Sequence, residues 1–520
     1  MLKQLFDPCF ANLSLVRLDE KSKKDAKNAG HGSLVTFSEV VFMSKFMMFA
    51  LVRGSDPQSF DILDKLKAFQ TKRNLSHQRN TPQPKLKRLF GLKSAKKKNN
   101  GEFYDLSTVI LDMDFHSNDY DANSVISEID GNAIFCFAPT MSYIQKGRLL
   151  RSLKASTAPS LILVDGSTLS VLSVHCKEML LEKNDVENFP WHDASPSSLL
   201  SGNFIRIKKN SSGDREVSVV NGLKKGVKAL YFGAKWCPPC RALTNQLIDV
   251  YGKIKEKTSN FEIVFCSFDR TKESFEEYLS EMPWVGFPFD SEVTNNVRHA
   301  FDVQGIPTVV ILDEDNNIIT KHGKNILLSD PKCLEFPWKH KDLYELNEFT
   351  VQRITDLPTL IMFTEGTPDD SIFAKEVLKT CADILYSQLK TSISAESNLS
   401  NLESSPSISN SFSETSSITS EMPVPSYADL IQVMYTGEHP ICDFILESLG
   451  LGQMELPLLV ICDTLTGFMA ICDKPDISDT TAVEFVNEYR SGKARVLPLP
   501  KAGPGVRNVA GIPLLQPENA

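Results

Sequence analysis

The sequence predicts an α/β protein with three tandem domains, each built on a central mixed sheet flanked by helices. Three segments share one pattern, in which a proline and any residue precede four mainly aliphatic positions and an aspartate: 159–165, 307–313 and 457–463. A short aliphatic run that opens with proline and closes with a polar residue is typical of a buried strand. The three segments begin about 150 residues apart, which is the size of one domain, and therefore indicate three copies of one unit.

Composition narrows the class of protein. The 520 residues are 42% hydrophobic and carry a formal net charge of -9, which favours packed cores and argues against general nucleic-acid binding. The longest apolar run, 46–52, is too short to cross a bilayer, and the first residues lack the form of a signal peptide. We therefore expect no membrane or nucleic-acid partner, and a cytoplasmic and nuclear location.

The middle copy, 196–340, contains the most informative stretch. An apolar segment, 229–232, predicts a strand; Cys237 and Cys240 follow at CxxC spacing, and 241–257 has helical periodicity. Strand and helix patterns continue to alternate as far as the strand that begins after Pro307. This alternation is typical of a βαβ unit. A zinc site would need a second close pair of cysteines or histidines, and no other two cysteines lie within four residues of each other. The sequence therefore favours a redox-active dithiol over structural thiols or a metal site. We expect this dithiol to work without a cofactor.

The position of Cys237 favours its thiolate form. It lies just before the first turn of the expected helix, where unpaired N–H groups and the helix dipole attract negative charge. Residues 217–248 contain no aspartate or glutamate but five basic residues, namely Lys224, Lys225, Lys228, Lys235 and Arg241.

These residues carry a family resemblance. The segments 236–240, 281–284, 305–307 and 335–338, which read WCPPC, EMPW, GIP and EFPW, resemble the central domain of nucleoredoxin, a thioredoxin-like family related to tryparedoxins. The resemblance is most specific over 226–340. It implies three thioredoxin-like domains, of which only the middle one carries the dithiol.

The resemblance also implies roles for residues around the dithiol. Cys237 would attack a target disulfide and Cys240 would resolve the mixed disulfide. Pro307 would be a cis proline that faces the dithiol and leaves the backbone of Ile306 free to pair with an extended substrate. Trp236 either packs locally or shields the substrate.

One position departs from the usual thioredoxin pattern. Many thioredoxins have a buried carboxylate in the strand six residues before the first cysteine, whereas this chain has Tyr231. Proton transfer must then use another group or water. Glu262 and Asp269 are acidic candidates between which the sequence does not decide.

The first copy, 34–195, follows an expected N-terminal extension, 1–33. Residues 53–57 occupy the position that corresponds to the CxxC motif, and they contain no cysteine. The first copy therefore cannot perform dithiol chemistry. Its insertion, 71–100, holds ten lysines and arginines and no acidic residue. This composition indicates a solvated flexible loop, or alternatively a patch for nuclear import or an acidic partner.

The third copy, 341–495, also lacks cysteines at the corresponding turn, 364–369. Its insertion, 391–425, is dominated by Ser, Asn, Glu and Pro, a composition that predicts disorder. The tail, 496–520, is rich in Pro and Gly and is expected to be flexible.

The sequence thus predicts a protein-disulfide reductase that acts on disulfide-containing or thiol-bearing proteins and is regenerated by an upstream dithiol reductant. Two alternatives stay open. The chain could be a redox-gated adaptor that holds signalling proteins, as the resemblance implies for Dishevelled-like partners in Wnt signalling. It could also be a tryparedoxin-like electron donor to peroxidases.

Overall fold

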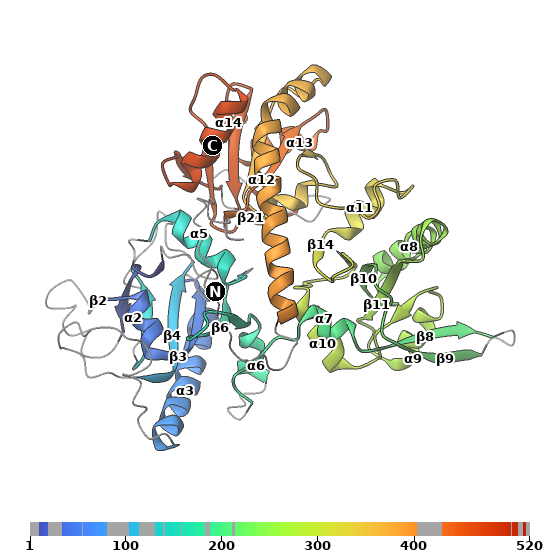
Figure 1. Ribbon diagram of the computed structural model, residues 1–520, viewed down its shortest axis with the longest axis horizontal. Helices are drawn as coiled ribbons and strands as arrows, with labels where there is room; N and C mark the ends of the chain where they lie inside the picture. Colours follow the sequence, from blue (N-terminus) through green and yellow to red (C-terminus); the bar gives the residue numbers. More distant parts are fainter. Residues whose placement is uncertain are drawn as a thin grey trace, which may run out of the picture. The chain divides into compact units, whose positions relative to one another are not determined.

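The computed structural model describes residues 10–18, 34–54, 56–80, 103–113, 131–138, 141–155, 158–182, 188–210, 214–402, 429–500, 502–507 and 513–515. The chain divides into two compact units, one formed by 1–193 with 426–429 and the other by 194–425 with 430–520. Among the described residues, three sheets of six or seven strands with flanking helices make up most of the fold, one in the first unit and two in the second (Figure 1), and a small two-stranded sheet also belongs to the second unit.

The first unit contains a seven-stranded sheet of order β2-β1-β5-β4-β3-β6-β7. Its centre is β3, which is buried along most of its length, pairs in parallel with β4 and pairs antiparallel with β6. The strands are β1 (Ser14–Arg17), β2 (Leu34–Thr36), β3 (Ser44–Val52), β4 (Tyr104–Asp112), β5 (Ile134–Phe137), β6 (Ser160–Asp165) and β7 (Val171–Ser173), and the helices are α2 (Phe37–Met43), α3 (Pro57–Asn80), α5 (Tyr143–Ser152) and α6 (Cys176–Glu182).

The central sheet, in the second unit, has the order β14-β13-β10-β11-β12-β8-β9. Both of its faces are buried: Tyr231 and Phe232 are neighbours on β10 but belong to different hydrophobic clusters. The strands are β8 (Asn203–Lys209), β9 (Arg215–Asn221), β10 (Val227–Gly233), β11 (Phe261–Ser267), β12 (Val285–Gly286), β13 (Thr308–Leu312) and β14 (Ile318–Thr320), and the helices are α7 (Pro196–Leu200), α8 (Pro238–Lys257), α9 (Lys272–Leu279), α10 (Ser291–Ala300) and α11 (Gly323–Ser329).

The third sheet, also in the second unit, has six strands in the order β15-β17-β16-β18-β19-β20. The long helix α12 contacts α14 and β17. The elements are β15 (Tyr344–Leu346), the 3-10 helix η3 (Val351–Thr355), β16 (Thr359–Phe363), α12 (Pro368–Leu402), β17 (Gln432–Thr436), α13 (Ile441–Ser448), β18 (Leu458–Asp463), β19 (Phe468–Ile471), α14 (Asp479–Arg490) and β20 (Val496–Pro498).

The centres of the three sheets share one topology. In each, a central strand has a parallel neighbour on one side and an antiparallel neighbour on the other, and these triplets are β4-β3-β6, β11-β10-β13 and β17-β16-β18. The antiparallel neighbour follows a cis proline in all three cases, namely Pro159, Pro307 and Pro457. The prediction of three tandem thioredoxin-like domains is confirmed.

Several elements extend beyond the ranges expected from the sequence. Strand β1 lies inside the expected extension 1–33, yet it joins the first sheet by pairing with β5. Helix α3 continues into the basic insertion and α12 into the Ser-rich one, because neither helix meets a proline or glycine before residue 80 or 402. In the expected tail, β20 pairs with β19, and β21 (Ala502–Arg507) pairs with β22 (Pro513–Leu515). The remaining parts of the two insertions, 81–100 and 403–425, lie outside the described residues.

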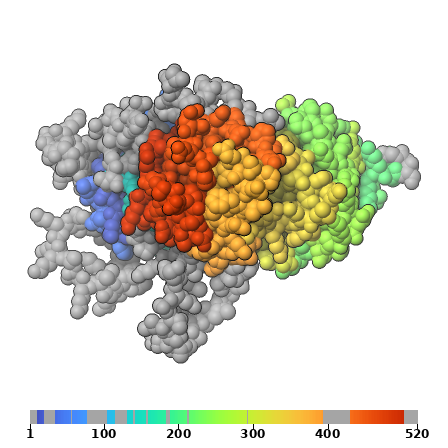
Figure 2. Space-filling model, turned by 90° about the horizontal axis from the view of Figure 1, so that it is seen from above, coloured from blue at the N-terminus to red at the C-terminus, as the bar shows by residue number. Residues whose placement is uncertain are grey.

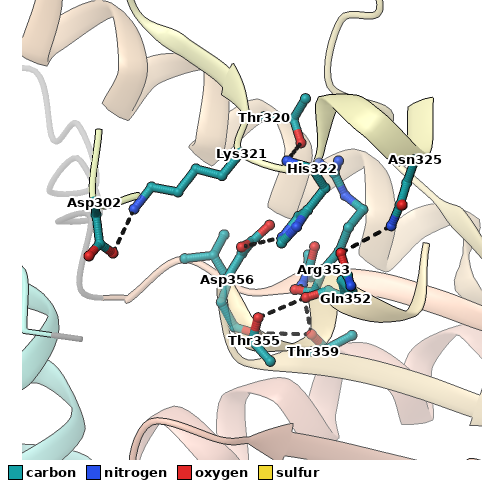
Figure 3. A network of polar contacts seen from close by, with 12 residues as sticks. Asp302, Thr320, Lys321, His322, Asn325, Gln352, Arg353, Thr355, Asp356 and Thr359 are labelled. Carbon is teal, nitrogen blue, oxygen red and sulfur yellow. Dashed lines mark hydrogen bonds and ion pairs between the residues drawn. The ribbon is translucent and has the colours of Figure 1, made fainter. Parts of the chain in front are cut away.

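Within the second unit, a polar junction connects the central sheet to the segment that leads into the third (Figure 3). His322 Nε2 lies 2.9 Å from Asp356 Oδ1, and Asn325 donates to Gln352 at 3.0 Å. In Figure 2 the yellow residues of this segment lie between the green residues of the central sheet and the orange and red residues of the third.

Candidate dithiol site

The strand-to-helix turn after β10 holds the dithiol that the sequence predicts. Cys237 is the N-cap of α8 and forms a disulfide with Cys240, with 5.3 Å between the two Cα atoms. Pro238 occupies the first helical position, where its missing N–H costs no hydrogen bond. Cys237 keeps 6% of its surface exposed and Cys240 none, so that of the two cysteines only the first is in contact with solvent.

Asp269 ties the dithiol turn to the neighbouring strand. Its side chain, 8% exposed, accepts hydrogen bonds from the backbone N–H of Lys235 and from the hydroxyls of Ser267 and Ser274, each at 2.9 Å. One carboxylate therefore connects the turn before Cys237, the end of β11 and the first turn of α9. Lys235 also forms an ion pair with Glu277 on α9.

A cluster of three hydroxyl groups lies under the first turn of α8. Tyr231 donates to the backbone oxygen of Cys240 at 2.9 Å, and Thr244 lies 3.1 Å from the same oxygen. The hydroxyl of Tyr278 completes the cluster, 2.6 Å from that of Thr244 and 3.2 Å from that of Tyr231. Burial raises the pKa of Tyr231 and of Tyr278 above the ordinary tyrosine value, so both stay protonated at neutral pH.

Ile306 and Pro307 lie on the other side of the dithiol. Strand β13 pairs with β10 so that Thr308 is opposite Phe232, which brings the preceding cis bond between Ile306 and Pro307 to the end of β10. The side chain of Ile306, together with that of Phe268, packs against the two cysteines. The structure thus brings together the predicted residues Cys237, Cys240, Ile306 and Pro307.

Trp236 points away from the core, with 51% of its surface exposed. Its indole Nε1 donates to the backbone oxygen of Phe268 at 3.1 Å, which fixes the ring beside the disulfide. The ring also lines a hollow of about 390 Å³ together with Arg270, Thr271 and Ser274. Both roles considered from sequence, local packing and substrate shielding, stay open for a side chain that is half exposed and also makes these local contacts.

The two acidic candidates lie in different places. Glu262 is at the start of β11, opposite Lys228, where it accepts from the Tyr251 hydroxyl and lies 3.7 Å from the side-chain nitrogens of Arg206 and Lys255. Asp269 follows the other end of the same strand, at the dithiol turn. Sequence analysis did not find Thr244, Tyr278 or Arg270, because their neighbours in space come from other elements.

The other cysteines of the described residues are buried and unpaired: Cys136, Cys176, Cys266, Cys333, Cys381, Cys442, Cys462 and Cys472. Burial raises the pKa of Cys266 to about 12 and that of Cys442 to about 11, which keeps both as unreactive thiols at neutral pH. The described parts of the chain contain no group of three or more potential metal ligands. They also contain no helix whose length and apolar character would let it span a bilayer.

Comparison with known proteins agrees with this geometry. Residues 226–318 match the family described as Thioredoxin-like, and residues 340–493 match the family described as Thioredoxin-like, C-terminal domain. Two of the three sheets therefore belong to thioredoxin-like domains by sequence as well as by topology.

The chain is 32% identical to human nucleoredoxin, over 68% of this chain and 73% of that protein. It is 37% identical to nucleoredoxin of Xenopus laevis, over 47% of this chain and 58% of that protein. It is also 36% identical to the solved structure titled tryparedoxin II complexed with glutathionylspermidine, over 26% of this chain and 92% of that one, with a TM-score of 0.23. The chain belongs to the nucleoredoxin family, a family of thioredoxin-like oxidoreductases.

Proposed function

We propose that this chain is a protein thiol–disulfide oxidoreductase that reduces disulfides of partner proteins. The observation that carries the proposal is the Cys237–Cys240 pair at the N-terminus of α8, in which Cys237 keeps a small exposed fraction and Cys240 keeps none. The helix N-terminus favours a thiolate at Cys237, and the adjoining Ile306–Pro307 segment offers backbone to an extended substrate.

The proposed reaction starts from the reduced dithiol. The Cys237 thiolate attacks one sulfur of the target disulfide; a bond between the two sulfurs forms, the target bond breaks, and the departing thiolate takes up a proton. Cys240 then loses its proton and attacks Cys237, which releases the second target thiol and leaves the Cys237–Cys240 disulfide. An upstream dithiol supplies the two electrons that reduce this disulfide again.

The test compares three cysteine variants in the reduction of a protein disulfide. Cys237→Ser should abolish turnover. Cys240→Ser should retain attack and accumulate mixed disulfides, which are visible on non-reducing gels. Cys266→Ser, which changes a buried thiol on β11, is the matched control and should keep turnover within a few-fold of the unaltered protein. Near-normal turnover by Cys237→Ser would contradict the proposal.

A second candidate is a redox-gated adaptor, with the oxidation state of the dithiol controlling the binding of signalling proteins of the Dishevelled type. It is favoured by the two flanking sheets, which keep the shared topology while α3 and α12 begin at Pro57 and Pro368 without cysteines in the preceding turns. Such an adaptor would bind a partner stoichiometrically and show little turnover. A tryparedoxin-like donor would instead sustain turnover of a peroxidase.

A further inference from the structure

We propose that the hollow beside Trp236 is a subsite that selects protein substrates with an acidic side chain close to the reactive cysteine. This inference rests on the proposed reductase function. It adds a substrate class to that function and names Arg270 as the residue that determines it.

The hollow adjoins the dithiol through two residues. Trp236, which forms one wall, directly precedes Cys237, and its indole N–H is bound to the backbone oxygen of Phe268. Phe268 in turn packs against the two cysteines. Since an extended chain advances about 3.3 Å per residue, a side chain one or two positions from a cysteine bound at Cys237 falls within reach of the hollow.

Arg270 supplies a positive charge that the described neighbours do not neutralise. Its guanidinium carbon lies 5.5 Å from the centre of the Trp236 ring, and it forms no ion pair with any carboxylate of the described residues. Three of the four carboxylates between residues 269 and 277 are engaged elsewhere, and the fourth, Glu273, forms no ion pair among the described residues. Asp269 accepts from the turn and from two serines, Glu277 pairs with Lys235, and Glu276 lies 3.8 Å from Lys272.

The remaining lining groups also favour a carboxylate. Thr271 accepts a hydrogen bond from the N–H of Ser274, which leaves its hydroxyl proton available to a ligand, whereas the Ser274 hydroxyl is used on Asp269. A guanidinium presents parallel N–H groups that match the two oxygens of a carboxylate. The exposed indole contacts the methylene groups that precede the acid. A lysine or arginine of the substrate would meet like charge at Arg270.

The experiment measures kcat/KM for short peptide disulfides that differ only beside the cysteine, with Glu, Gln or Lys at that position. The peptides are acetylated and amidated, so that the tested side chain carries the only carboxylate. Each rate is divided by the rate of the same variant with uncharged 2,2'-dithiodipyridine. The unaltered protein should prefer Glu over Lys by about tenfold at low salt.

Arg270→Glu should reverse this preference, and Arg270→Gln should remove it. Lys224→Glu is the matched control, because it makes the same charge change at an exposed residue before β10, at the end of the strand remote from the dithiol. It should keep the preference for Glu.

The inference is overturned if the unaltered protein treats the three peptides alike, or if Arg270→Glu and Lys224→Glu change the preference equally. An unaltered protein that reduces neither the peptides nor 2,2'-dithiodipyridine would instead overturn the proposed reductase function.

Discussion

At the scale of single residues, Asp269 is the group on which the geometry of the dithiol turn depends. Asp269→Ala would leave the N–H of Lys235 and the hydroxyls of Ser267 and Ser274 without their acceptor. We expect a loss of about 2–4 kcal/mol in the free energy of unfolding and a lower rate of disulfide reduction at a temperature where the protein stays folded.

Glu262→Ala is the control for this prediction, because it removes a carboxylate from the opposite end of β11. It should lower the thermal stability while the rate at the dithiol stays close to normal. Equal effects of the two substitutions on the rate would show that Asp269 has no special connection to the turn. Thermal unfolding and reduction of 2,2'-dithiodipyridine measure both quantities.

Some site residues could be identified from the sequence because they are neighbours along the chain, whereas others come together only through folding. Cys237 and Cys240 are three positions apart and are followed by a helical pattern, so they can be identified from the local sequence. The sequence offered Asp269 only as one of two acidic candidates, because the three elements that it connects meet only in the folded chain. Thr244 and Tyr278 were not identified, since they meet Tyr231 across α8, α9 and β10. Such contacts have no pattern in a single sequence.

At the scale of elements, two glycines near the dithiol should respond in opposite ways to alanine. Gly252 lies inside α8 with open space around its Cα, so Gly252→Ala should stabilise the protein by about 0.8–1 kcal/mol. Gly233 ends β10, and an added Cβ would lie 2.7 Å from the buried hydroxyl oxygen of Tyr231. Gly233→Ala should therefore destabilise by about 1–3 kcal/mol. Chemical denaturation measures both, and a stabilising Gly233→Ala would contradict the packing described here.

The ends of elements were harder to predict than their centres. The strand and helix patterns around the dithiol predicted β10, α8 and β11 because apolar periodicity is strong there. The Ser-rich composition after residue 390 predicted disorder, yet α12 continues through Leu402. Amino-acid composition indicates whether a segment has enough apolar residues to form a buried core. A helix that has already formed can add further turns as long as no proline or glycine interrupts it.

At the scale of the whole molecule, His340 links the stability of the second unit to pH. Burial, with the neighbouring Arg353 guanidinium, lowers the pKa of this histidine from 6.5 to about 4. Arg353 Nη2 lies 3.4 Å from its Nδ1, and the hydroxyl of Tyr386 on α12 donates to its backbone oxygen. His340 is therefore neutral in the folded protein at physiological pH.

The direction of the pH effect follows from the lowered pKa. The unfolded chain binds a proton at His340 below about pH 6.5, whereas the folded chain does so only near pH 4. The contribution of His340 to the free energy of unfolding is therefore fully present above pH 6.5. It decreases as the pH falls towards 4, by about 3 kcal/mol in total.

His340→Gln tests this link. The variant should show a flatter decline in stability between pH 6.5 and 4 than the unaltered protein. His192→Gln, which changes an exposed histidine of the first unit, serves as the control. Thermal unfolding at a series of pH values provides the measurement, and an unchanged slope in His340→Gln would show that another group governs the decline.

The hydroxyl cluster under α8 has a further consequence for how protons are arranged near the dithiol. Tyr231 and Thr244 can both direct their hydrogens at the backbone oxygen of Cys240, and Tyr278 can then donate into the pair. Each hydroxyl can also rotate and accept instead. The cluster can thus reverse its dipoles without moving a heavy atom or creating a charge. A change in charge at Cys240, whose backbone oxygen the cluster contacts, can then be met by reorientation, a response that a fixed buried carboxylate in place of Tyr231 would not give.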